Sequence, residues 1–448
     1  EIYTLSLHDA LPISTSLVEV FNVCWPMYAA MPAVLKEAVE HSYEDCGWDL
    51  TESTNDYGEG LYPSFSDVAR NVREILDTSE YDAENKGAYK GALLTRLRSL
   101  TNGINGMVFA SVGLDDAELF EDRVIVDLSR VGSSETKSLL MGVLVLKLRE
   151  YLMSSFPVAN KGLRHLTVLE EAHNLLRRVS TEQSAEGANL LGKSVEMLTN
   201  AIAEMRAYGE GFVVIDQAPG LLDLAAIRNT NTKIIMRLPD EDDRQLVGRS
   251  ANLNDRQIKE LARLPQGVAA VYQNEWVEPV LCKVERFEVP SVPYAYVRPE
   301  APDPSGKRED ALLIAELLSG GRTVFGPERL KDLRKRLDAL GVEAFVQVLI
   351  LRFLQAPPAE PRMTRLGPVM SALFPDVRRA VVSSHRESAF DMSAWTRAAS
   401  ECLAQEAQTT LAEQVRRDII QAIVTDYLYN ELHDENALRE WSIKGGLA

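Results

Sequence analysis

Two adjacent carboxylates follow a short apolar run near the middle of the chain. Residues 166–176 read LTVLEEAHNLL, and Glu170 and Glu171 come directly after four residues of strand character. Such a run is typical of a strand buried on both faces of a parallel sheet, and ligands bind at the carboxyl ends of such strands. In nucleoside triphosphate hydrolysis, one carboxylate holds Mg²⁺ and a second orients the attacking water. We interpret the pair as a Walker B element; an acidic strand-to-loop junction without chemistry is the alternative.

Polar residues at the ends of two other predicted strands are further candidates. Gln217 follows a buried strand predicted at residues 212–216, where its amide would sense a γ-phosphate or the catalytic water; a loop cap is the alternative. Asp127 lies in a strand predicted at residues 123–128 and is either a buried carboxylate facing the nucleotide or a structural cap. His173, just beyond the acid pair, is expected to pack or to form hydrogen bonds rather than to act as a catalyst.

Three arginines lie beyond the strand that leads into Gln217. They are Arg228, Arg237 and Arg244. In a ring-shaped assembly, one of them would reach the nucleotide of a neighbouring subunit as an arginine finger. A surface salt bridge is the alternative for each of them, and the sequence does not distinguish among the three.

The pattern GxxxxGKS occurs at residues 187–194, but its surroundings do not suit a phosphate-binding loop. Such a loop needs a buried strand running into it, so that backbone amides and a helix N-terminus face the phosphates. Here the preceding residues are RRVSTEQSAE, and the match comes after the acidic strand rather than before it. We interpret it as a glycine-bearing loop that enters a helix, in which Lys193 could touch a neighbour or DNA. Residues 15–165 offer no other phosphate loop, so either the chain is not an NTPase or that loop lies upstream.

Strands and helices alternate between residues 123 and 238, which predicts an α/β fold with a parallel sheet and helices on both faces. The strands are expected at residues 123–128, 166–169, 212–216 and 232–238, and the longer helices at residues 135–153 and 191–208. A hairpin is expected over residues 267–284. The region 36–120 reads as a helical insertion, with Ser66 as the N-cap of a helix that follows it.

The composition is that of a globular protein and sets limits on its partners. The net charge of −18 means that the surface as a whole will not attract nucleic acid, so a nucleic-acid role requires basic residues gathered in a pore or groove. The four cysteines form no CxxC pair and no cluster, which is typical of a cytoplasmic, reducing compartment without a zinc site. The uncharged run over residues 20–35 is too short to span a bilayer and is expected to be buried, so no membrane association is predicted.

The boundaries of the chain suggest four parts. Residues 1–14 look like a translated sequencing-adapter read, and the chain that follows is then expected to begin inside a domain. Residues 15–290 form a truncated ATPase core, and residues 291–305 form a proline-rich linker. Residues 306–448 form a separate α-helical C-terminal domain.

From residue 15 to about residue 290, the sequence resembles HerA-type ATPases of the HerA/FtsK branch of RecA-like motors. The resemblance is carried by the order and spacing of five blocks: VIVDLSRVGSSETKSLLMG, LTVLEEAHNLL, EGANLLGKSVEMLTNAIAEMRAYGEGFVVIDQAPGLLD, RNTNTKIIMRLPDEDDR and LPQGVAAVYQNEWVEPVLCKV. In these blocks the first acid is Glu170, where many motor ATPases carry Asp.

The resemblance implies a RecA-like sheet and the cofactors ATP and Mg²⁺. Glu170 would take the Mg²⁺ position, Glu171 would polarise the water, and Gln217 would be the sensor. Asp127, Arg228 and Arg237 are further candidates for nucleotide contact. The phosphate loop of the family lies upstream of the helical insertion, so this chain alone is expected to hydrolyse ATP poorly or not at all.

The partners implied are double-stranded DNA, a homo-hexameric ring and a nuclease or effector. A DNA translocase or helicase is the leading hypothesis. A nucleotide-responsive scaffold or signalling ATPase in a defence system is the alternative from another class, and a conjugation or secretion motor is a third.

Overall fold

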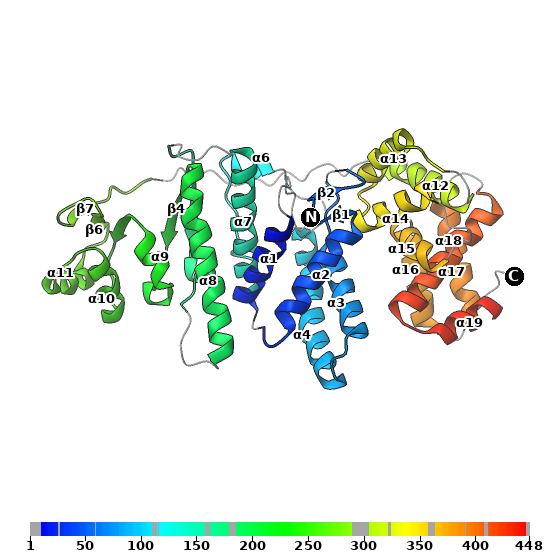
Figure 1. The fold of residues 1–448 in the computed structure, drawn as a ribbon, viewed down its shortest axis with the longest axis horizontal. Coiled ribbons are helices and arrows are strands. Elements are labelled where there is room, and N and C mark those ends of the chain that lie inside the picture. Colours follow the sequence, from blue (N-terminus) through cyan, green and yellow to red (C-terminus); the bar gives the residue numbers. More distant parts are fainter. Residues whose placement is uncertain are drawn as a thin grey trace.

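The computed structural model describes residues 10–25, 27–58, 60–109, 114, 116–156, 162–178, 185–288, 304–320, 324–356, 363–389, 391–406 and 411–444. Its elements are spread along one long axis (Figure 1). The strands β4, β6 and β7 lie toward one end, the first four helices lie near the middle, and the helices from α12 onward lie at the other end.

The N-terminal helices pack on the same hydrophobic core as the long helices that follow them. They are α1 (Ala10–Cys24), α2 (Met31–Asp45), α3 (Phe65–Thr78), α4 (Ala83–Thr101), α5 (Gly103–Val108) and α6 (Asp116–Phe120). The two-residue strands β1 (Trp48–Asp49) and β2 (Thr54–Asn55) form a small antiparallel pair. Val20, Phe21 and Leu35 are fully buried, which confirms the prediction that the run over residues 20–35 contributes to the core, although Tyr28 within it is exposed.

Helix α3 is stabilised at its N-terminus by Ser64, not by Ser66 as the sequence suggested. The Ser64 hydroxyl accepts from the backbone N–H of Asp67, and the Asp67 carboxylate accepts from the backbone N–H of Ser64. This reciprocal arrangement is a capping box, which satisfies two donors that the first turn leaves free. Ser66 is exposed and lies within the helix. The apolar stripe of Val68, Val72 and Leu76 is fully buried, as the spacing predicted.

The strand that carries the acid pair and the strand that leads into Gln217 are parallel neighbours. Helix α7 (Ser134–Ser155) precedes β3 (His165–Glu170), and α8 (Ala185–Met205) connects β3 to β4 (Glu210–Ile215). The register pairs Leu166 with Gly211 and Glu170 with Ile215. The two strands therefore end at the same level, as the strand–helix–strand pattern predicted.

The rest of the expected parallel sheet is not observed in the described part of the chain. Residues 123–128 are extended but form no strand, and Ile125 among them is 94% exposed. β5 (Thr232–Ile235) pairs antiparallel with β6 (Val268–Gln273), which pairs antiparallel with β7 (Val280–Lys283). The hairpin prediction is thus confirmed, whereas the strand at 123–128 and the parallel pairing of β5 are corrected. Strand propensity alone does not create a strand, because a strand also needs an edge to pair with.

Three short helices lie between β4 and the hairpin. They are α9 (Leu224–Asn229), α10 (Glu241–Ser250) and α11 (Asp255–Glu260). Asp240 caps α10 and Asn254 caps α11, each by accepting from backbone N–H groups of the first turn. The acidic first turn of α10 suits the positive end of the helix dipole.

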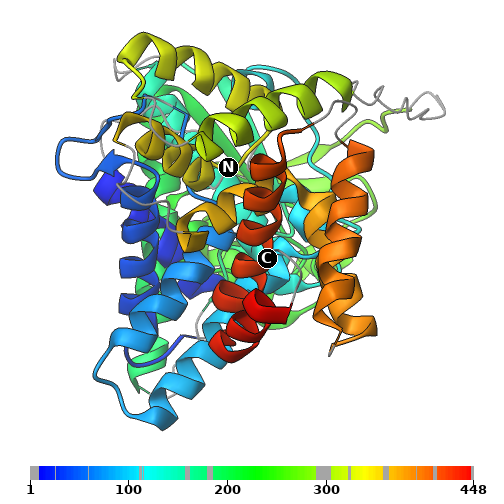
Figure 2. The same ribbon diagram turned by 90° about the vertical axis from the view of Figure 1, so that its right-hand side faces the viewer.

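The secondary structure described from residue 304 onward is all helical, as predicted. The helices are α12 (Pro304–Ser319), α13 (Pro327–Leu340), α14 (Ala344–Gln355), α15 (Met363–Leu373), α16 (Pro375–Glu387), α17 (Met392–Glu406), α18 (Glu413–Thr425), a π-helical segment (Asp426–Glu431) and α19 (Glu435–Lys444). Figure 2 views the chain from this end, with these helices in front. They surround a second core that includes the buried Trp395 and Trp441. Of the predicted linker, residues 291–303 lie outside the described residues.

The C-terminal helices contact the N-terminal ones directly. The guanidinium of Arg70 in α3 lies 3.6 Å from the ring centre of Phe345, and Arg334 donates to the backbone carbonyl of Tyr57. Among the described helices, none has both the length and the apolar character that crossing a bilayer requires.

The cap of α3 gives a direct test of this part of the fold. Ser64→Ala is expected to lower the free energy of unfolding by about 1 kcal/mol, because it removes a capping acceptor. Ser66→Ala is the matched control and should change stability little, since Ser66 is exposed and lies within the helix rather than at its N-cap. Urea-induced unfolding of both variants measures the difference; equal stability would contradict the cap assignment.

Candidate functional site

The parallel pairing of β3 and β4 brings Glu171 and Gln217 into contact. Each lies just past the end of its strand, and the Nε2 amide of Gln217 donates to Oε1 of Glu171 at 2.7 Å. The two residues are 46 positions apart in sequence. The structure therefore joins the two predicted catalytic side chains at the carboxyl end of a parallel pair, where α/β proteins bind ligands.

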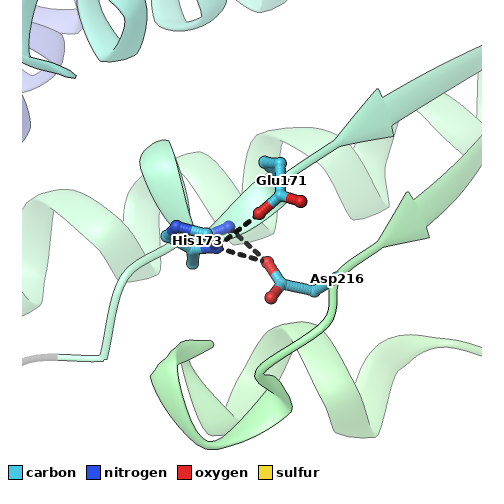
Figure 3. Close-up of side chains that lie close together, drawn as sticks. All are labelled: Glu171, His173 and Asp216. Atoms are coloured by element: carbon cyan, nitrogen blue, oxygen red, sulfur yellow. Dashed lines mark hydrogen bonds and ion pairs between the residues drawn. The ribbon is translucent and has the colours of Figure 1, made fainter. Parts of the chain in front are cut away.

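A buried carboxylate, Asp216, lies beside this contact (Figure 3). Its side chain is only 2% exposed. Oδ2 accepts from the backbone N–H of His173 at 2.8 Å and lies 2.8 Å from the His173 ring Nδ1. Oδ1 accepts from the backbone N–H of Ala218 at 2.9 Å. The buried carboxyl group thus accepts from two backbone N–H groups and lies within hydrogen-bonding distance of a ring nitrogen, which is how proteins accommodate a buried polar group.

Glu171 itself has a left-handed backbone conformation, with φ +52° and ψ +48°. This region costs a residue with a Cβ free energy, and such residues gather at functional sites. The conformation turns the chain out of β3 into a 3₁₀ turn over Ala172–Asn174. The carbonyl of Glu171 accepts from both the backbone N–H and the side-chain amide of Asn174. As a result, the Glu171 carboxylate lies toward β4, where it meets Gln217.

Glu171, His173 and Asp216 together offer three ligand atoms within 4.8 Å of one another. The second Glu171 oxygen, Oε2, lies 3.6 Å from the His173 Nδ1. An oxygen-rich group of this kind suits a divalent cation in its chemistry. The 2.8 Å separation of Nδ1 and Asp216 Oδ2 is that of a hydrogen bond. In this arrangement, Asp216 and His173 form a hydrogen-bonded pair.

A second histidine–carboxylate pair joins the opposite ends of the same two strands. Glu210 is buried, and its carboxylate lies 2.8 Å from Nδ1 of His165 and accepts from the Thr167 hydroxyl at 2.6 Å. The pair connects the first residues of β3 and β4, which are partners in the register. β3 and β4 are therefore linked by side chains at both ends, with only one end next to Glu171.

The remaining predicted site residues lie outside the Glu171 cluster; Glu170 precedes Glu171 in the chain and ends β3 with an exposed side chain. Asp127 is exposed and accepts from the backbone N–H of Ser129 at 2.8 Å; hydrogen bonding from Ser129 lowers the pKa of this carboxyl. The structure thus gives Asp127 the geometry of a cap, one of its two predicted roles. Arg228 and Arg237 are exposed, with no hydrogen bond or ion pair to the cluster among the described residues. Arg244 donates to the carbonyl of Leu238 at 3.1 Å.

The GxxxxGKS match lies inside helix α8, which begins at Ala185. A phosphate loop wraps the phosphates with irregular backbone before its helix starts, so a match within a helix does not provide that cradle. The prediction that residues 187–194 are not a phosphate loop agrees with the structure, whereas the glycine-bearing loop predicted there is corrected, because these residues are already helical. The described residues therefore bring acids and an amide together at the ends of β3 and β4 but supply no phosphate loop.

Two residues of the cluster were not assigned a catalytic-site role from the sequence. His173 forms hydrogen bonds, as predicted, and Asp216 is the last residue of the strand predicted at residues 212–216. The sequence feature that could have indicated their role is the Asp-Gln pair at the end of one predicted strand, because the neighbouring strand also ends in acids. Their contact spans 43 residues and depends on the pairing of β3 with β4.

Curated proteins similar to this chain carry one recurring name. The chain is 24% identical over 263 residues to a DNA double-strand break repair helicase HerA of Sulfolobus acidocaldarius, a match that covers 57% of this chain and 48% of that protein. It is 30% identical over 124 residues to a probable DNA double-strand break repair helicase HerA of Methanocaldococcus jannaschii, covering 28% of this chain and 23% of the relative. No family model matches the chain.

Among solved structures, VirB4 of Thermoanaerobacter pseudethanolicus aligns with a TM-score of 0.47 and 15% identity, over 64% of this chain and 73% of that one. The HerA matches confirm the resemblance noted in the sequence: the chain is HerA-like. It spans about half the length of the first relative, since the match covers 48% of that protein.

The left-handed conformation of Glu171 predicts an inverted order of stability for two variants. Glu171→Gly should be more stable than Glu171→Ala by about 1 kcal/mol, because glycine adopts positive φ without the Cβ penalty. At the neighbouring Glu170, which lies in a strand, the usual order should hold and the Gly variant should be the less stable. Chemical denaturation of the four variants tests this; the same order at both positions would contradict the observed backbone.

Proposed function

We propose that this chain is part of a HerA-like, Mg²⁺- and ATP-dependent ring motor that translocates on or unwinds double-stranded DNA. The observation that carries the proposal is the contact between Glu171 and Gln217 at the carboxyl end of the parallel pair, in a chain whose curated relatives are HerA helicases. The parallel pair would then be part of a larger RecA-like sheet. A homo-hexamer and a nuclease or effector partner belong to the same proposal.

The residues divide the work as follows in this proposal. Glu170, exposed at the end of β3, would hold Mg²⁺, which neutralises charge on the phosphate oxygens when bound. Glu171 would orient and polarise the attacking water, since its carboxylate is 40% exposed and can reach a solvent molecule. Gln217, hydrogen-bonded to that carboxylate, would sense the γ-phosphate. Arg228 and Arg237 are exposed and would be free to approach a neighbouring subunit.

The acidic surface constrains how DNA would be bound. With a net charge of −18, binding would have to occur where basic side chains gather, as in the pore of a ring. The four cysteines are free thiols, which supports a cytoplasmic location.

Glu171→Gln tests the proposed role of the water-orienting acid. In a protein that includes the region matched by the longer relatives, the variant should bind ATP normally but lose turnover by about 100-fold or more, since the amide no longer polarises water. Glu278→Gln is the control, because it makes the same change at an exposed glutamate on the hairpin. Steady-state ATPase and nucleotide-binding assays give the result. Retained turnover in Glu171→Gln would remove Glu171 from this role.

DNA dependence separates a motor from a nucleotide-responsive scaffold. A motor should hydrolyse ATP faster when double-stranded DNA is added, and the stimulation should fall as salt rises, because salt weakens phosphate contacts. An ATPase rate that is independent of DNA at every salt concentration would contradict the motor proposal and favour the scaffold.

A further inference from the structure

We propose that Asp216 and His173 are positioning residues that hold both Glu171 and Gln217 in place for hydrolysis. The inference rests on the proposed function and deepens it, because neither residue is assigned a role by that proposal. The geometry that supports it is the distribution of contacts over the two oxygens of a single buried carboxylate.

One oxygen of Asp216 fixes the turn that carries Glu171. Oδ2 accepts from the backbone N–H of His173 and lies 2.8 Å from the ring Nδ1 of the same residue. Two contacts to one residue restrain both its backbone and its ring. Since His173 is two positions beyond Glu171, these contacts restrain the 3₁₀ turn that begins with the left-handed Glu171. The free-energy cost of that conformation is offset by the hydrogen bonds that follow it.

The other oxygen of Asp216 fixes the turn that carries Gln217. Oδ1 accepts from the backbone N–H of Ala218, which closes an Asx-type turn around Gln217. The same carboxylate therefore shapes the backbone on β3 and on β4. The 2.7 Å hydrogen bond between Gln217 and Glu171 requires both turns at once. Removing the Asp216 carboxylate would loosen the turn that carries Glu171 and the turn that carries Gln217. Removing the side chain of Glu171 or of Gln217 alone would not loosen both turns.

Burial makes these contacts strong. The Asp216 side chain is 2% exposed, so water does not compete for its oxygens. An ionised carboxylate can only accept hydrogen bonds. If Asp216 is to accept from the His173 ring, Nδ1 of that ring must carry the proton. Nδ1 also lies 3.6 Å from Oε2 of Glu171, so the ring lies beside this carboxylate (Figure 3) and faces the oxygen that Gln217 does not contact.

The pair at the far end of the same strands provides a matched control. His165 and Glu210 form the same kind of contact, also with a buried carboxylate, and also between β3 and β4. They differ from His173 and Asp216 in position, since they lie at the amino ends of the strands. If the two pairs act only by holding β3 and β4 together, breaking either pair should have the same effect. If the pair of His173 and Asp216 positions Glu171, breaking that pair alone should affect activity.

The functional test compares these two pairs in a protein that includes the region matched by the longer relatives. His173→Ala and Asp216→Asn should lower kcat about 10- to 100-fold with little change in KM for ATP, as expected when a reacting group is displaced by a fraction of an ångström. His173→Asn should recover much of the loss, because its amide donates from a position close to that of Nδ1. His165→Ala, the same change at the other pair, should leave kcat near the wild-type value.

A second measurement keeps the test independent of ATPase activity. Nitrogen NMR of the six histidines in the chain reports which ring nitrogen of His173 carries the proton. Nδ1–H is expected in the wild type, and Asp216→Asn should shift His173 toward the Nε2–H form. Finding Nε2–H in the wild type would overturn the positioning contact.

The outcomes separate the two proposals. An active wild type whose His173→Ala and Asp216→Asn variants keep full kcat would overturn the positioning inference alone. Equal losses in His165→Ala and His173→Ala would also overturn it, since strand pairing would then explain the effect. A wild type that does not hydrolyse ATP would overturn the proposed function and this inference with it, and the NMR result would not rescue either.

Discussion

The arrangement of the site depends on the hydrogen bonds that the buried Asp216 carboxylate accepts. Its oxygens bind one turn at the end of β3 and another at the end of β4, and the strands themselves are in parallel register. Parallel strands end at the same edge, but their ends are loops with many accessible conformations. The carboxylate selects one conformation on each side. Glu171 and Gln217 can therefore meet although neither is held by the strand hydrogen bonds.

At Glu171, the residue type that the backbone favours differs from the one that the proposed chemistry needs. Glu171 lies at a position where glycine would fit more easily, because its φ is +52°. A glycine there would relieve strain and remove the carboxylate. A glutamate at this position is thus better explained by what its side chain does than by what its backbone prefers. The surrounding contacts to Asn174 and Asp216 compensate for the strain locally.

Much of the site could be predicted from sequence because it depends on local order. An apolar run followed by acids, and another followed by Asp-Gln, gave β3 and β4, their parallel pairing and the proximity of Glu171 to Gln217. The exclusion of residues 187–194 as a phosphate loop also required only the polar stretch before them. The helical character beyond residue 304 followed from spacing and composition.

What could not be predicted depends on partners far away in sequence. Residues 123–128 have strand-forming side chains, yet nothing in the described chain pairs with them, and Val124, Ile125 and Val126 remain exposed. β5 has the same character and pairs antiparallel with β6, because the hairpin offers it an edge. The choice of Ser64 over Ser66 as a cap depends on where α3 begins. The roles of Asp216 and His173 depend on a contact between two turns 43 residues apart.

One face of the β3–β4 pair is uncovered in the described structure, and apolar side chains are exposed on it. Leu166, Val168, Val213 and Ile215 alternate on one face and are 39% to 54% exposed, whereas Leu169, between Val168 and Glu170, is buried. Alternation of this kind is the period of two that a strand imposes. A strand whose sequence predicts burial on both faces is here covered on one. The sequence predicted the strand correctly and its surroundings only in part.

The central claim is that Glu171 and Gln217 face a nucleotide from the ends of β3 and β4. An experimental structure of the longer protein with Mg²⁺ and a non-hydrolysable ATP analogue tests it most directly. We expect the metal beside Glu170, the γ-phosphate within hydrogen-bonding distance of Gln217, and Asp216 still bonded to His173. A nucleotide bound away from the ends of these two strands, with Glu171 remote from its γ-phosphate, would contradict the account.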